Sequence, residues 1–277
     1  MNPVISCFGA AIRTDKWIRF YDSLSTNKTS FEVIFIGDKR PDFTLPDNMR
    51  FIYSTVKPAQ CAHIGFLYAK GDYFVHAVDD CVYNDRALDR LLKTLRKQGE
   101  DKTYVTPRYK TFRPYKKRGR KREQLAGFVR IKPKKGKHPL LPVGGIISRK
   151  LWEKIDGVDR RFICSDWEFD QAMRLWQAGG QVTICKKAMI TEIRETPNPA
   201  LLPHDHKDYD RALFYSFWCV SSKNPRQRYT PDNLMPPMTK KTPPYKYKVV
   251  NTRSVPFEPY EETADILTKT QGPKGIW

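Results

Sequence analysis

Short apolar segments alternate with segments of helical periodicity through the first hundred residues, and this pattern limits the fold more than any other feature of the sequence. The apolar segments have the length of buried strands and cover residues 4–8, 32–36, 49–53 and 73–78. The helical patterns lie between and after them, at residues 17–24, 58–70 and 85–98. Strands that alternate with helices build a sheet flanked by helices, so we predict an α/β fold.

Three residues are predicted to delimit these helices. Gly71 follows the second helix at a position where a left-handed residue is favoured, and Gly99 ends the third. Asn84 precedes the third helix, whose leucines recur on one face, and is predicted to be its N-cap. The second and third helices are therefore bounded by specific residues as well as by periodicity.

Regular patterns resume after residue 141. The predicted strands and helices cover, in chain order, residues 142–148, 149 onward, 169–176, 181–185 and 208–220. The last 55 residues hold nine of the 21 prolines, which favours an extended tail over a second core. The sequence thus predicts one domain over residues 1–222 and a proline-rich tail packed on it over residues 223–277.

The positive charge of the chain is concentrated in one segment. The sequence has 50 Lys and Arg residues against 30 Asp and Glu, a net charge of +20. Residues 101–150 hold 17 of these cations and two acids, a net charge of +15, centred on a cationic segment at 108–137. Such local charge predicts a polyanionic partner. Aromatic residues alternate with the cations, which predicts a long hairpin or a loop that orders on binding; they are Tyr109, Phe112, Tyr115 and Phe128.

Composition excludes several classes of protein. No apolar stretch approaches the ~20 residues that span a bilayer, and the N-terminus lacks the charged region of a signal peptide. The six cysteines are scattered without CxxC pairs, so the sequence predicts neither a disulfide framework nor a structural zinc site. We expect reduced, mostly buried thiols in a cytoplasmic protein.

Acidic residues follow two of the predicted strands. Asp79 and Asp80 end one strand, at the edge where open α/β sheets bind their ligands. Two adjacent carboxylates repel each other, which favours a bound cation. Asp38 ends another strand and fits a carboxylate that accepts hydrogen bonds from a base or ribose. Taken alone, each acid also fits an ordinary turn.

Two further groups are candidates for chemistry. Asp166 precedes the helix around residues 169–176, where it fits either an N-cap or a base whose charged form is favoured by the helix dipole. His204 and His206 stand two residues apart in a polar loop and are candidate metal ligands. Each of these positions, taken alone, leaves both a structural and a chemical role open.

The order of these motifs resembles the family 2 nucleotide-sugar glycosyltransferases, which have the GT-A fold. The resemblance covers roughly residues 3–190 and depends on the succession of motifs. They are, in order, EVIFIGD at 32–38, AKGDY at 69–73, DD at 79–80, GGIISR at 144–149, GVDRRF at 157–162, SDWE at 165–168 and RLWQAGG at 174–180. The resemblance implies a mixed, Rossmann-like sheet flanked by helices, to which this sequence adds a basic insert and an extended tail.

The resemblance also implies roles for single residues. Asp38 matches the carboxylate that holds the uracil and ribose of a UDP-sugar. Asp79 and Asp80 match the acidic motif at the donor diphosphate, in which Asp80 would bind Mn²⁺ or Mg²⁺. Asp166 matches the catalytic base. A late histidine often completes the metal shell in this fold, and the candidates are His204 and His206.

The sequence departs from the family pattern at two positions. Cys81 stands where a third acid is frequent, and Ser165 replaces the Glu that usually precedes the base. Glu168 is therefore a second candidate for the base. In such an enzyme a divalent cation neutralises the leaving diphosphate while the base takes the proton of the acceptor hydroxyl. One in-line displacement of this kind predicts inversion at the anomeric carbon.

The cationic segment lies between the acidic motif and the candidate base, on the acceptor side of the resembled fold. Cations for phosphates and aromatic residues for stacking suit nucleic acid, so we predict DNA as the acceptor. The target would be a hydroxyl on a 5-hydroxymethylpyrimidine, since ordinary bases carry no alcohol. By role, this resembles the DNA glycosyltransferases of bacteriophages. The predicted DNA contacts are Arg113, Lys116, Lys117, Arg118, Arg120, Lys121, Arg122, Lys134, Lys135 and Lys137.

Two other functions remain open. A basic surface also suits an anionic glycan or a lipid-linked acceptor at a membrane, although the sequence shows no anchor. Cys81 and Ser165 fit a non-catalytic nucleic-acid-binding protein on a degenerate transferase fold. The presence of Asp38, Asp80 and Asp166 together argues against that function. Neither the sugar nor the modified base follows from the sequence.

Overall fold

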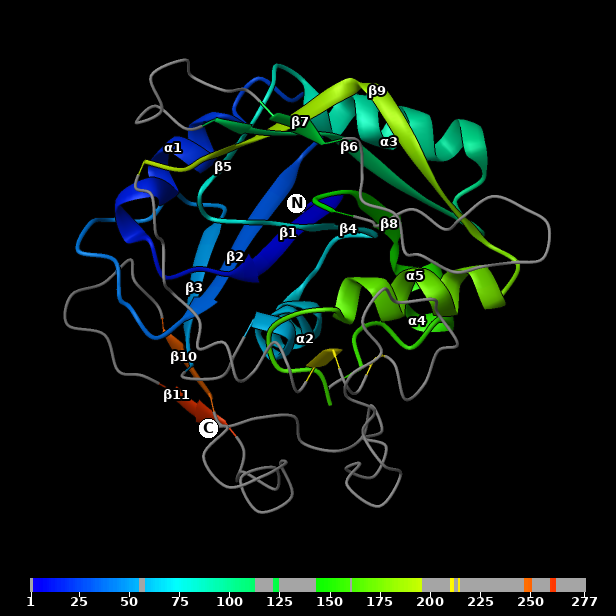
Figure 1. Cartoon of the computed structure of the whole chain (residues 1–277). Coiled ribbons are helices and arrows are strands. Elements are labelled where there is room, and N and C mark those ends of the chain that lie inside the picture. Colours follow the sequence, from blue (N-terminus) through cyan, green and yellow to red (C-terminus); the bar gives the residue numbers. More distant parts are fainter. Residues whose placement is uncertain are drawn as a thin grey trace.

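A mixed β-sheet runs through the centre of the molecule, with helices on both faces (Figure 1). The computed structural model describes residues 2–54, 58–112, 122–124, 143–159, 161–195, 210–211, 214, 247–250 and 260–262. The strands in this part are β1 (Ile5–Ala10), β2 (Phe31–Gly37), β3 (Met49–Tyr53), β4 (Tyr73–His76), β5 (Cys81–Tyr83), β6 (Thr103–Phe112), β7 (Arg122–Gln124), β8 (Ile146–Ser148), β9 (Gln181–Ile193), β10 (Tyr247–Val250) and β11 (Tyr260–Glu262). The helices are α1 (Trp17–Asp22), α2 (Pro58–Tyr68), α3 (Ala87–Gln98), α4 (Arg149–Lys154) and α5 (Trp167–Gln177).

The strand order places a ligand-binding edge beside β1. β1 pairs in parallel with β2 on one side and with β4 on the other, so that Ile5 lies opposite both Phe31 and Tyr73. β3 continues the parallel part beyond β2. The chain passes from β1 to β2 on one side and reaches β4 on the other. The carboxyl ends of β1 and β4 therefore form a topological switch point, where open sheets bind ligands.

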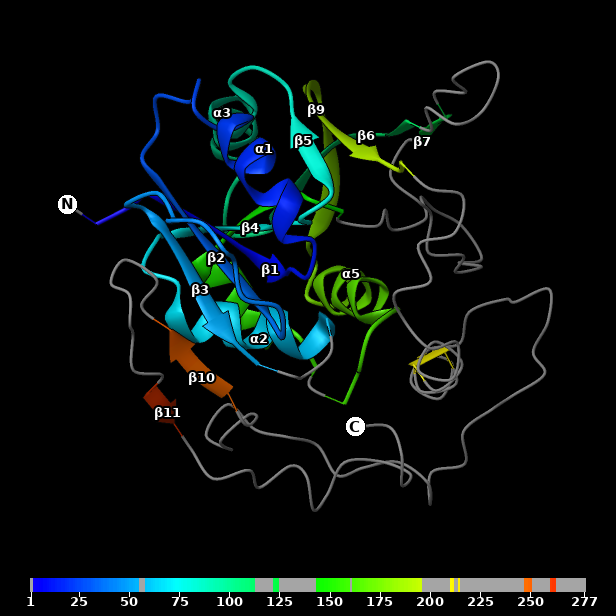
Figure 2. The same cartoon turned by 90° about the vertical axis from the view of Figure 1, so that its left-hand side faces the viewer.

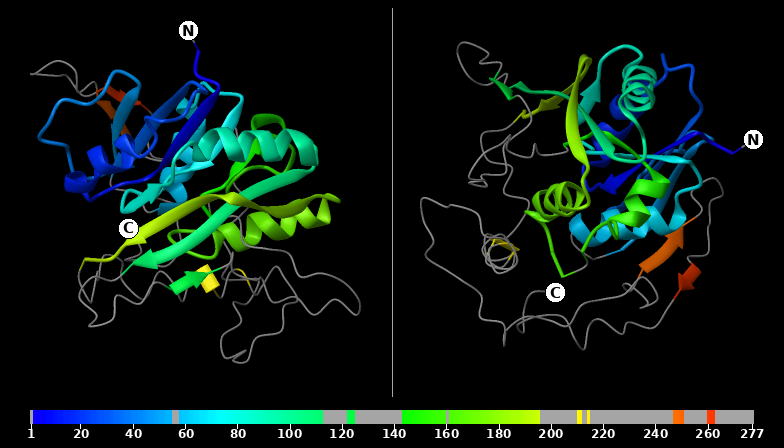
Figure 3. Two further views of the ribbon diagram at one scale, coloured as in Figure 1. Left: turned by 90° about the horizontal axis from the view of Figure 1, so that it is seen from above. Right: turned by 90° about the vertical axis from the view of Figure 1, so that its right-hand side faces the viewer.

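The other half of the sheet is mostly antiparallel. β8 pairs antiparallel with both β4 and β6, and β5 pairs antiparallel with β9. β6 and β9 are long parallel neighbours that curve together, with an irregularity in register between Pro107 and Arg108 (Figure 3). β7 pairs antiparallel with β6, so a hairpin is present within the cationic segment where Tyr109 faces Gln124.

Each face of the sheet has its own hydrophobic core (Figure 1). On one face, α1 and α3 bury Trp17, Phe20 and the leucines of α3 against the sheet. On the other, α2, α4 and α5 bury Trp152 among their neighbours. Gly65 lets α2 approach β1, because a Cβ atom at this position would lie 2.7 Å from the Phe8 side chain. Each large apolar side chain that is fully buried contributes about 2–3 kcal/mol to folding.

The structure confirms the predicted alternation over the first hundred residues but corrects two helix ends. Asn84 is not the N-cap of α3; its Oδ1 accepts the Met189 N–H at 2.8 Å and its Nδ2 donates to the Lys187 carbonyl at 3.1 Å. Its amide thus joins the start of α3 to β9, and Arg86 stands at the N-cap. Gly71 does not have a positive φ. It is required because a Cβ there would lie 2.8 Å from the backbone nitrogen of Ser6.

Part of the predicted C-terminal tail extends the sheet. β10 pairs antiparallel with β3, with Lys248 opposite Tyr53, and β11 pairs with β10 (Figure 2). The three described residues within the predicted helix at 208–220 are helical. Among the described residues no helix has the length and hydrophobicity needed to cross a membrane. Five cysteines within these residues are buried and form no disulfide, and Cys219 lies outside them.

Candidate active site

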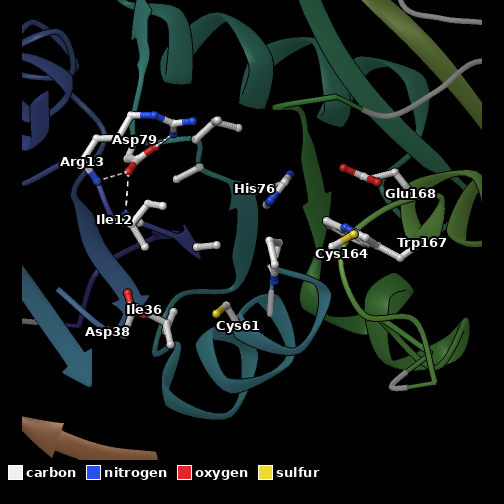
Figure 4. A pocket seen from close by; sticks show the side chains of 16 residues that line it. Ile12, Arg13, Ile36, Asp38, Cys61, His76, Asp79, Cys164, Trp167 and Glu168 are labelled. Carbon is white, nitrogen blue, oxygen red and sulfur yellow. Dashed lines mark hydrogen bonds and ion pairs between the residues drawn. The ribbon is translucent and has the colours of Figure 1, made fainter. Parts of the chain in front are cut away.

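A cavity of about 280 Å³ lies at the carboxyl ends of β1, β2 and β4 (Figure 4). The segments after these strands supply Arg13, Asp38 and Asp79 to its wall, and β4 itself supplies His76. The beginnings of α2 and α5 close it, and α5 contributes Glu168. The fold thus brings these five chemistry-bearing side chains to the switch point, the default place for a ligand in an open sheet.

Asp79 joins the end of β4 to the end of β1. Its Oδ2 accepts hydrogen bonds from the backbone N–H groups of Ile12 and Arg13, both at 2.8 Å. Its Oδ1 lies 2.5 Å from Nη1 of Arg13, and the side chain is only 1% exposed. Hydrogen bonds to an ionised carboxylate are stronger than those between neutral groups. Asp79 therefore fixes this wall of the cavity and orients the Arg13 guanidinium along it.

Asp80 is a buried carboxylate whose Oδ1 accepts a hydrogen bond from the Cys81 thiol at 3.6 Å. Its Oδ2 lies 3.5 Å from Nη1 of Arg13, beyond hydrogen-bonding distance. Burial raises the pKa of Asp80, the Arg13 cation lowers it, and the neighbouring carboxylates Asp79 and Glu192 raise it again. Glu192 belongs to β9 and was not singled out from the sequence. Glu192 is paired with Arg194, whose cation also acts on Asp80. Counting Asp80 itself, three carboxylates face two guanidinium groups, and this net negative charge favours binding of a positive ion there.

The residues around Asp80 fit a divalent cation that is held mainly by the phosphates of a bound substrate and only in part by protein side chains. Within the described ranges, no group of three or more His, Cys, Asp or Glu side chains is arranged to hold a metal ion. Mg²⁺ is commonly bound through one or two carboxylates together with substrate phosphates, and does not need a closed protein cage. The hard oxygen donors of Asp80 suit this mode. The candidate ligands His204 and His206 lie outside the described residues.

The two candidate bases have different surroundings. Asp166 stands at the N-cap of α5 with a positive φ of 57°, but its side chain makes no capping hydrogen bond. Instead, its Oδ2 accepts a hydrogen bond from Nε of Arg211 at 3.2 Å. Burial raises the pKa of Asp166, and Arg211 lowers it. Non-glycine residues with a positive φ are uncommon and cluster at functional sites.

Glu168 lines the cavity in the first turn of α5. Burial raises its pKa to about 8, and the nearby Asp166 and Asp210 add to the rise. A carboxyl group with such a pKa carries its proton at neutral pH and becomes a comparatively strong base once ionised. The structure therefore places Glu168 in the cavity wall and pairs Asp166 with a cation beside it.

Asp210 is a buried residue of the site that the sequence analysis missed. Its carboxylate accepts hydrogen bonds from three successive backbone N–H groups at 2.7, 2.6 and 2.7 Å, those of Ile163, Cys164 and Ser165. Burial raises the pKa of Asp210 to about 6. The loop that it holds leads directly into α5 and contributes Cys164 to the cavity. No sequence signal marks Asp210, because its partners are backbone groups that any residue supplies.

His76 was also missed, although the sequence carries a signal for it. It is the one polar residue within the apolar run 73–78, at the carboxyl end of β4. Its ring meets the Trp167 ring nearly at right angles, with centroids 4.7 Å apart. Burial lowers the pKa of His76 to about 4, so that its imidazole is neutral near pH 7. A histidine in a buried strand that ends at a ligand-binding edge is the pattern that identifies it.

The predicted DNA-contacting side chains cannot be placed. Arg122 begins β7, where the structure describes the backbone. The others lie outside the described residues; they are Arg113, Lys116, Lys117, Arg118, Arg120, Lys121, Lys134, Lys135 and Lys137.

The structure does establish where the cationic segment leaves and rejoins the sheet. It leaves at Phe112, which pairs with Ile193 at the end of β9. The Ile193 N–H donates to the backbone carbonyl of Asp80 at 3.0 Å. The chain rejoins the described part just before Gly144, whose carbonyl accepts the Tyr83 hydroxyl at 3.0 Å. The described residues that precede position 113 and follow position 142 therefore lie beside Asp80 and β5.

Comparison with known proteins identifies the fold. No protein-family model matches the chain, and no curated protein matches it in sequence. A solved structure with a similar fold is the crystal structure of GalNAc-T7 with UDP, GalNAc and Mn²⁺, at a TM-score of 0.54 and 13% sequence identity. The match covers 79% of this chain and 52% of the other, so this chain spans about half the length of that structure. The predicted mixed α/β fold of the GT-A type is thereby confirmed.

We predict that Asp210→Asn destabilises the protein by about 2–4 kcal/mol. The three backbone N–H groups of residues 163–165 are bonded to the two carboxylate oxygens of Asp210, whereas an amide side chain has only one oxygen that can accept. The free energy of unfolding is measured by urea denaturation at pH 7.5. The control is Asp101→Asn, an exposed acid after α3, for which we expect a change below about 0.5 kcal/mol. Equal effects of the two substitutions would contradict the assigned role of Asp210.

The raised pKa of Glu168 predicts a pH-dependent stability. Between its ordinary pKa of 4.5 and the folded value of about 8, the folded state keeps a proton that the unfolded state releases. The stability of the wild type therefore falls as the pH rises through this range. Glu168→Gln removes the titrating group and leaves the other buried acids unchanged. We expect the unfolding free energy of the variant, relative to wild type, to rise by roughly 2 kcal/mol or more from pH 5 to pH 8. A difference that is the same at both pH values would refute the raised pKa.

Proposed function

We propose that this protein is a glycosyltransferase that uses a nucleotide-sugar donor, with a UDP-sugar as the favoured class. The observation that carries the proposal is the composition of the cavity at the switch point. Its wall presents the carboxylate of Asp38, the guanidinium of Arg13 and the carboxyl group of Glu168. These groups suit, in turn, a nucleoside, a diphosphate and an acceptor hydroxyl. The fold likeness to a protein crystallised with UDP and Mn²⁺ supports the same class.

Two residues of the cavity wall suit the nucleotide. Asp38 is exposed directly after β2, where its carboxylate can accept hydrogen bonds from uracil or ribose. Gly37 allows this end of β2 to approach β1, because a Cβ there would lie 2.1 Å from the carbonyl oxygen of Ala11. Arg13 is held in the wall by Asp79, with its side chain 25% exposed. Its cation opposes the negative charge that develops on the departing diphosphate.

Glu168 is the proposed base, with Asp166 as the alternative. As the acceptor oxygen bonds to the anomeric carbon, the bond from that carbon to the diphosphate breaks with its electron pair. The acceptor proton passes to the ionised form of the Glu168 carboxylate, which is the minor form at neutral pH because the pKa is about 8. The configuration of the sugar inverts. Glu168 is supported because it lines the cavity, whereas Arg211 pairs with Asp166. A divalent cation bound at Asp80 would supply further neutralisation of the leaving group.

The proposed acceptor is a hydroxyl on a 5-hydroxymethylpyrimidine in DNA. The support is the net charge of +15 over residues 101–150 and the place at which the cationic segment joins the sheet. The chain enters the undescribed part of this segment after Phe112 and returns before Gly144, and both of these residues lie beside Asp80 and β5. A polyanion bound by this segment would therefore approach the candidate site. The hydroxymethylated pyrimidine must leave the base stack of the duplex, or lie in a single strand, to reach the cavity.

Incubation with Mn²⁺, labelled sugar nucleotides and DNA tests the function and the acceptor together. We expect label on DNA that contains hydroxymethylated pyrimidines and none on unmodified DNA. Asp80→Asn should lower the transfer rate at least about 100-fold, because it weakens charge neutralisation at the leaving group, and should leave DNA affinity within about twofold. The matched control is Asp101→Asn, which should leave both unchanged.

The other outcomes of this assay identify the competing functions. Label on an anionic glycan or a lipid-linked acceptor would keep the glycosyltransferase and replace the acceptor. Tight DNA binding without consumption of any sugar nucleotide would contradict the enzyme and support a nucleic-acid-binding protein.

The cationic segment is tested through the salt dependence of DNA binding. Neutralising four of its cations should weaken DNA affinity and reduce the slope of log K against log salt by up to about 3.6, since each phosphate contact contributes about 0.9. These cations are Arg118, Arg120, Lys121 and Arg122. The control neutralises four exposed lysines elsewhere, Lys93, Lys97, Lys102 and Lys150. An unchanged slope in the first variant would remove the segment from the DNA contact.

A further inference from the structure

His76 occupies the middle of the cavity and has no part in the roles assigned so far. Figure 4 shows its ring between Asp79 on one side and Glu168 on the other, and all three line the same cavity. The ring meets that of Trp167 at 81°, with centroids 4.7 Å apart. The imidazole and the indole therefore form an aromatic surface on the Glu168 side of the cavity.

One ring nitrogen of His76 is buried without a partner. Within the described part of the chain, no group hydrogen-bonds its Nδ1 atom. Buried polar atoms are nearly always paired in native proteins, and an unpaired one lowers stability. Burial lowers the pKa of His76 to about 4, so the ring is neutral near pH 7 and offers one donor and one acceptor. A hydroxyl group, which both donates and accepts, matches either tautomer of this ring.

The neighbouring groups indicate which part of a donor lies against His76. Arg13, beside Asp79, suits the diphosphate, and Glu168 is the proposed base for the acceptor. In the proposed displacement, the anomeric carbon lies between the diphosphate and the acceptor oxygen. The transferred sugar therefore lies between Arg13 and Glu168, where the wall is formed by His76 and Trp167. The carbon-bound face of a sugar packs on aromatic rings, while its hydroxyls need hydrogen-bonding partners.

We propose that His76 is a specificity-determining residue of the sugar subsite, whose Nδ1 atom hydrogen-bonds one hydroxyl of the transferred sugar. This inference rests on the proposed function. A donor that lacks this hydroxyl leaves Nδ1 unpaired, and a site built to bind a hydroxyl discriminates strongly against such an analogue.

The test compares UDP with UDP-sugars on His76→Phe, which keeps an aromatic ring against Trp167 and removes both nitrogens. Dissociation constants are measured by calorimetry with Mn²⁺ for UDP, UDP-glucose, UDP-galactose and UDP-N-acetylglucosamine. For the UDP-sugar that the wild type binds best, we expect about tenfold weaker binding by the variant, and binding of UDP within twofold. Without ligand, the variant should melt at the same or a higher temperature, because the unpaired nitrogen has been removed.

A second measurement needs no substitution. The ¹⁵N resonance of Nδ1 in the wild type should shift when the UDP-sugar is added and stay in place when UDP is added. The control His63→Asn alters a buried histidine of α2 that does not line the cavity, and should leave the affinity for UDP-sugar unchanged.

The outcomes separate this inference from the proposed function. If the wild type binds a UDP-sugar and His76→Phe binds it equally well, or if the Nδ1 resonance does not respond to the sugar, the inference is overturned and the function stands. If His76→Phe weakens the binding of UDP and of UDP-sugar by the same factor, the inference is also overturned, because His76 would then support the cavity as a whole. A wild type that binds neither UDP nor any of the UDP-sugars overturns the proposed function, and the inference with it.

Discussion

The carboxylate of Asp79 holds together the two strand ends on which the cavity depends. β1 and β4 are neighbours in the sheet, and the chain beyond each of them forms one wall of the cavity. Asp79 connects these walls through two backbone N–H groups and the guanidinium of Arg13. Removing the carboxylate would leave all three donors without their acceptor in a part-buried place, which costs more than the bond itself contributes. The position of Arg13, and hence the charge inside the cavity, follows from this one contact.

The remaining walls are positioned by groups distant in sequence. Asp210 holds the loop before α5 through three backbone N–H groups, and α5 then carries Glu168 into the cavity. Four carboxylates with raised pKa values result: Asp80, Asp166 and Asp210 are buried, and Glu168 is partly buried in the cavity wall. Such a concentration of acids lowers the stability of the fold. It also gives the site acids and bases that titrate closer to neutral pH than free carboxyl groups do.

Much of the fold could be predicted because its parallel half has the clearest periodicity. Strands β1 to β4 are apolar runs between helical patterns, and acids placed directly after them fall at one edge of the sheet by topology alone. β9 was predicted only as far as Cys185, because two consecutive lysines, Lys186 and Lys187, interrupt its alternation of apolar and polar residues. Pro107 and the irregular register beside it likewise interrupt the pattern of β6. Asn84 looked like a helix cap because local rules favour it there, whereas its amide bonds to β9. Asp210 depends on tertiary neighbours, which local sequence does not encode, whereas the position of His76 in an apolar strand at the ligand-binding edge is visible in the sequence.

The central claim is that the cavity between β1, β4 and α5 binds a nucleotide-sugar donor. A crystal structure of the full chain with UDP and Mn²⁺ tests this most directly. The account predicts the uracil and ribose beside Asp38, the diphosphate beside Arg13, and the metal on a carboxylate oxygen of Asp80. A nucleotide bound elsewhere on the protein, or a cavity that stays without nucleotide at saturating UDP and Mn²⁺, would contradict it.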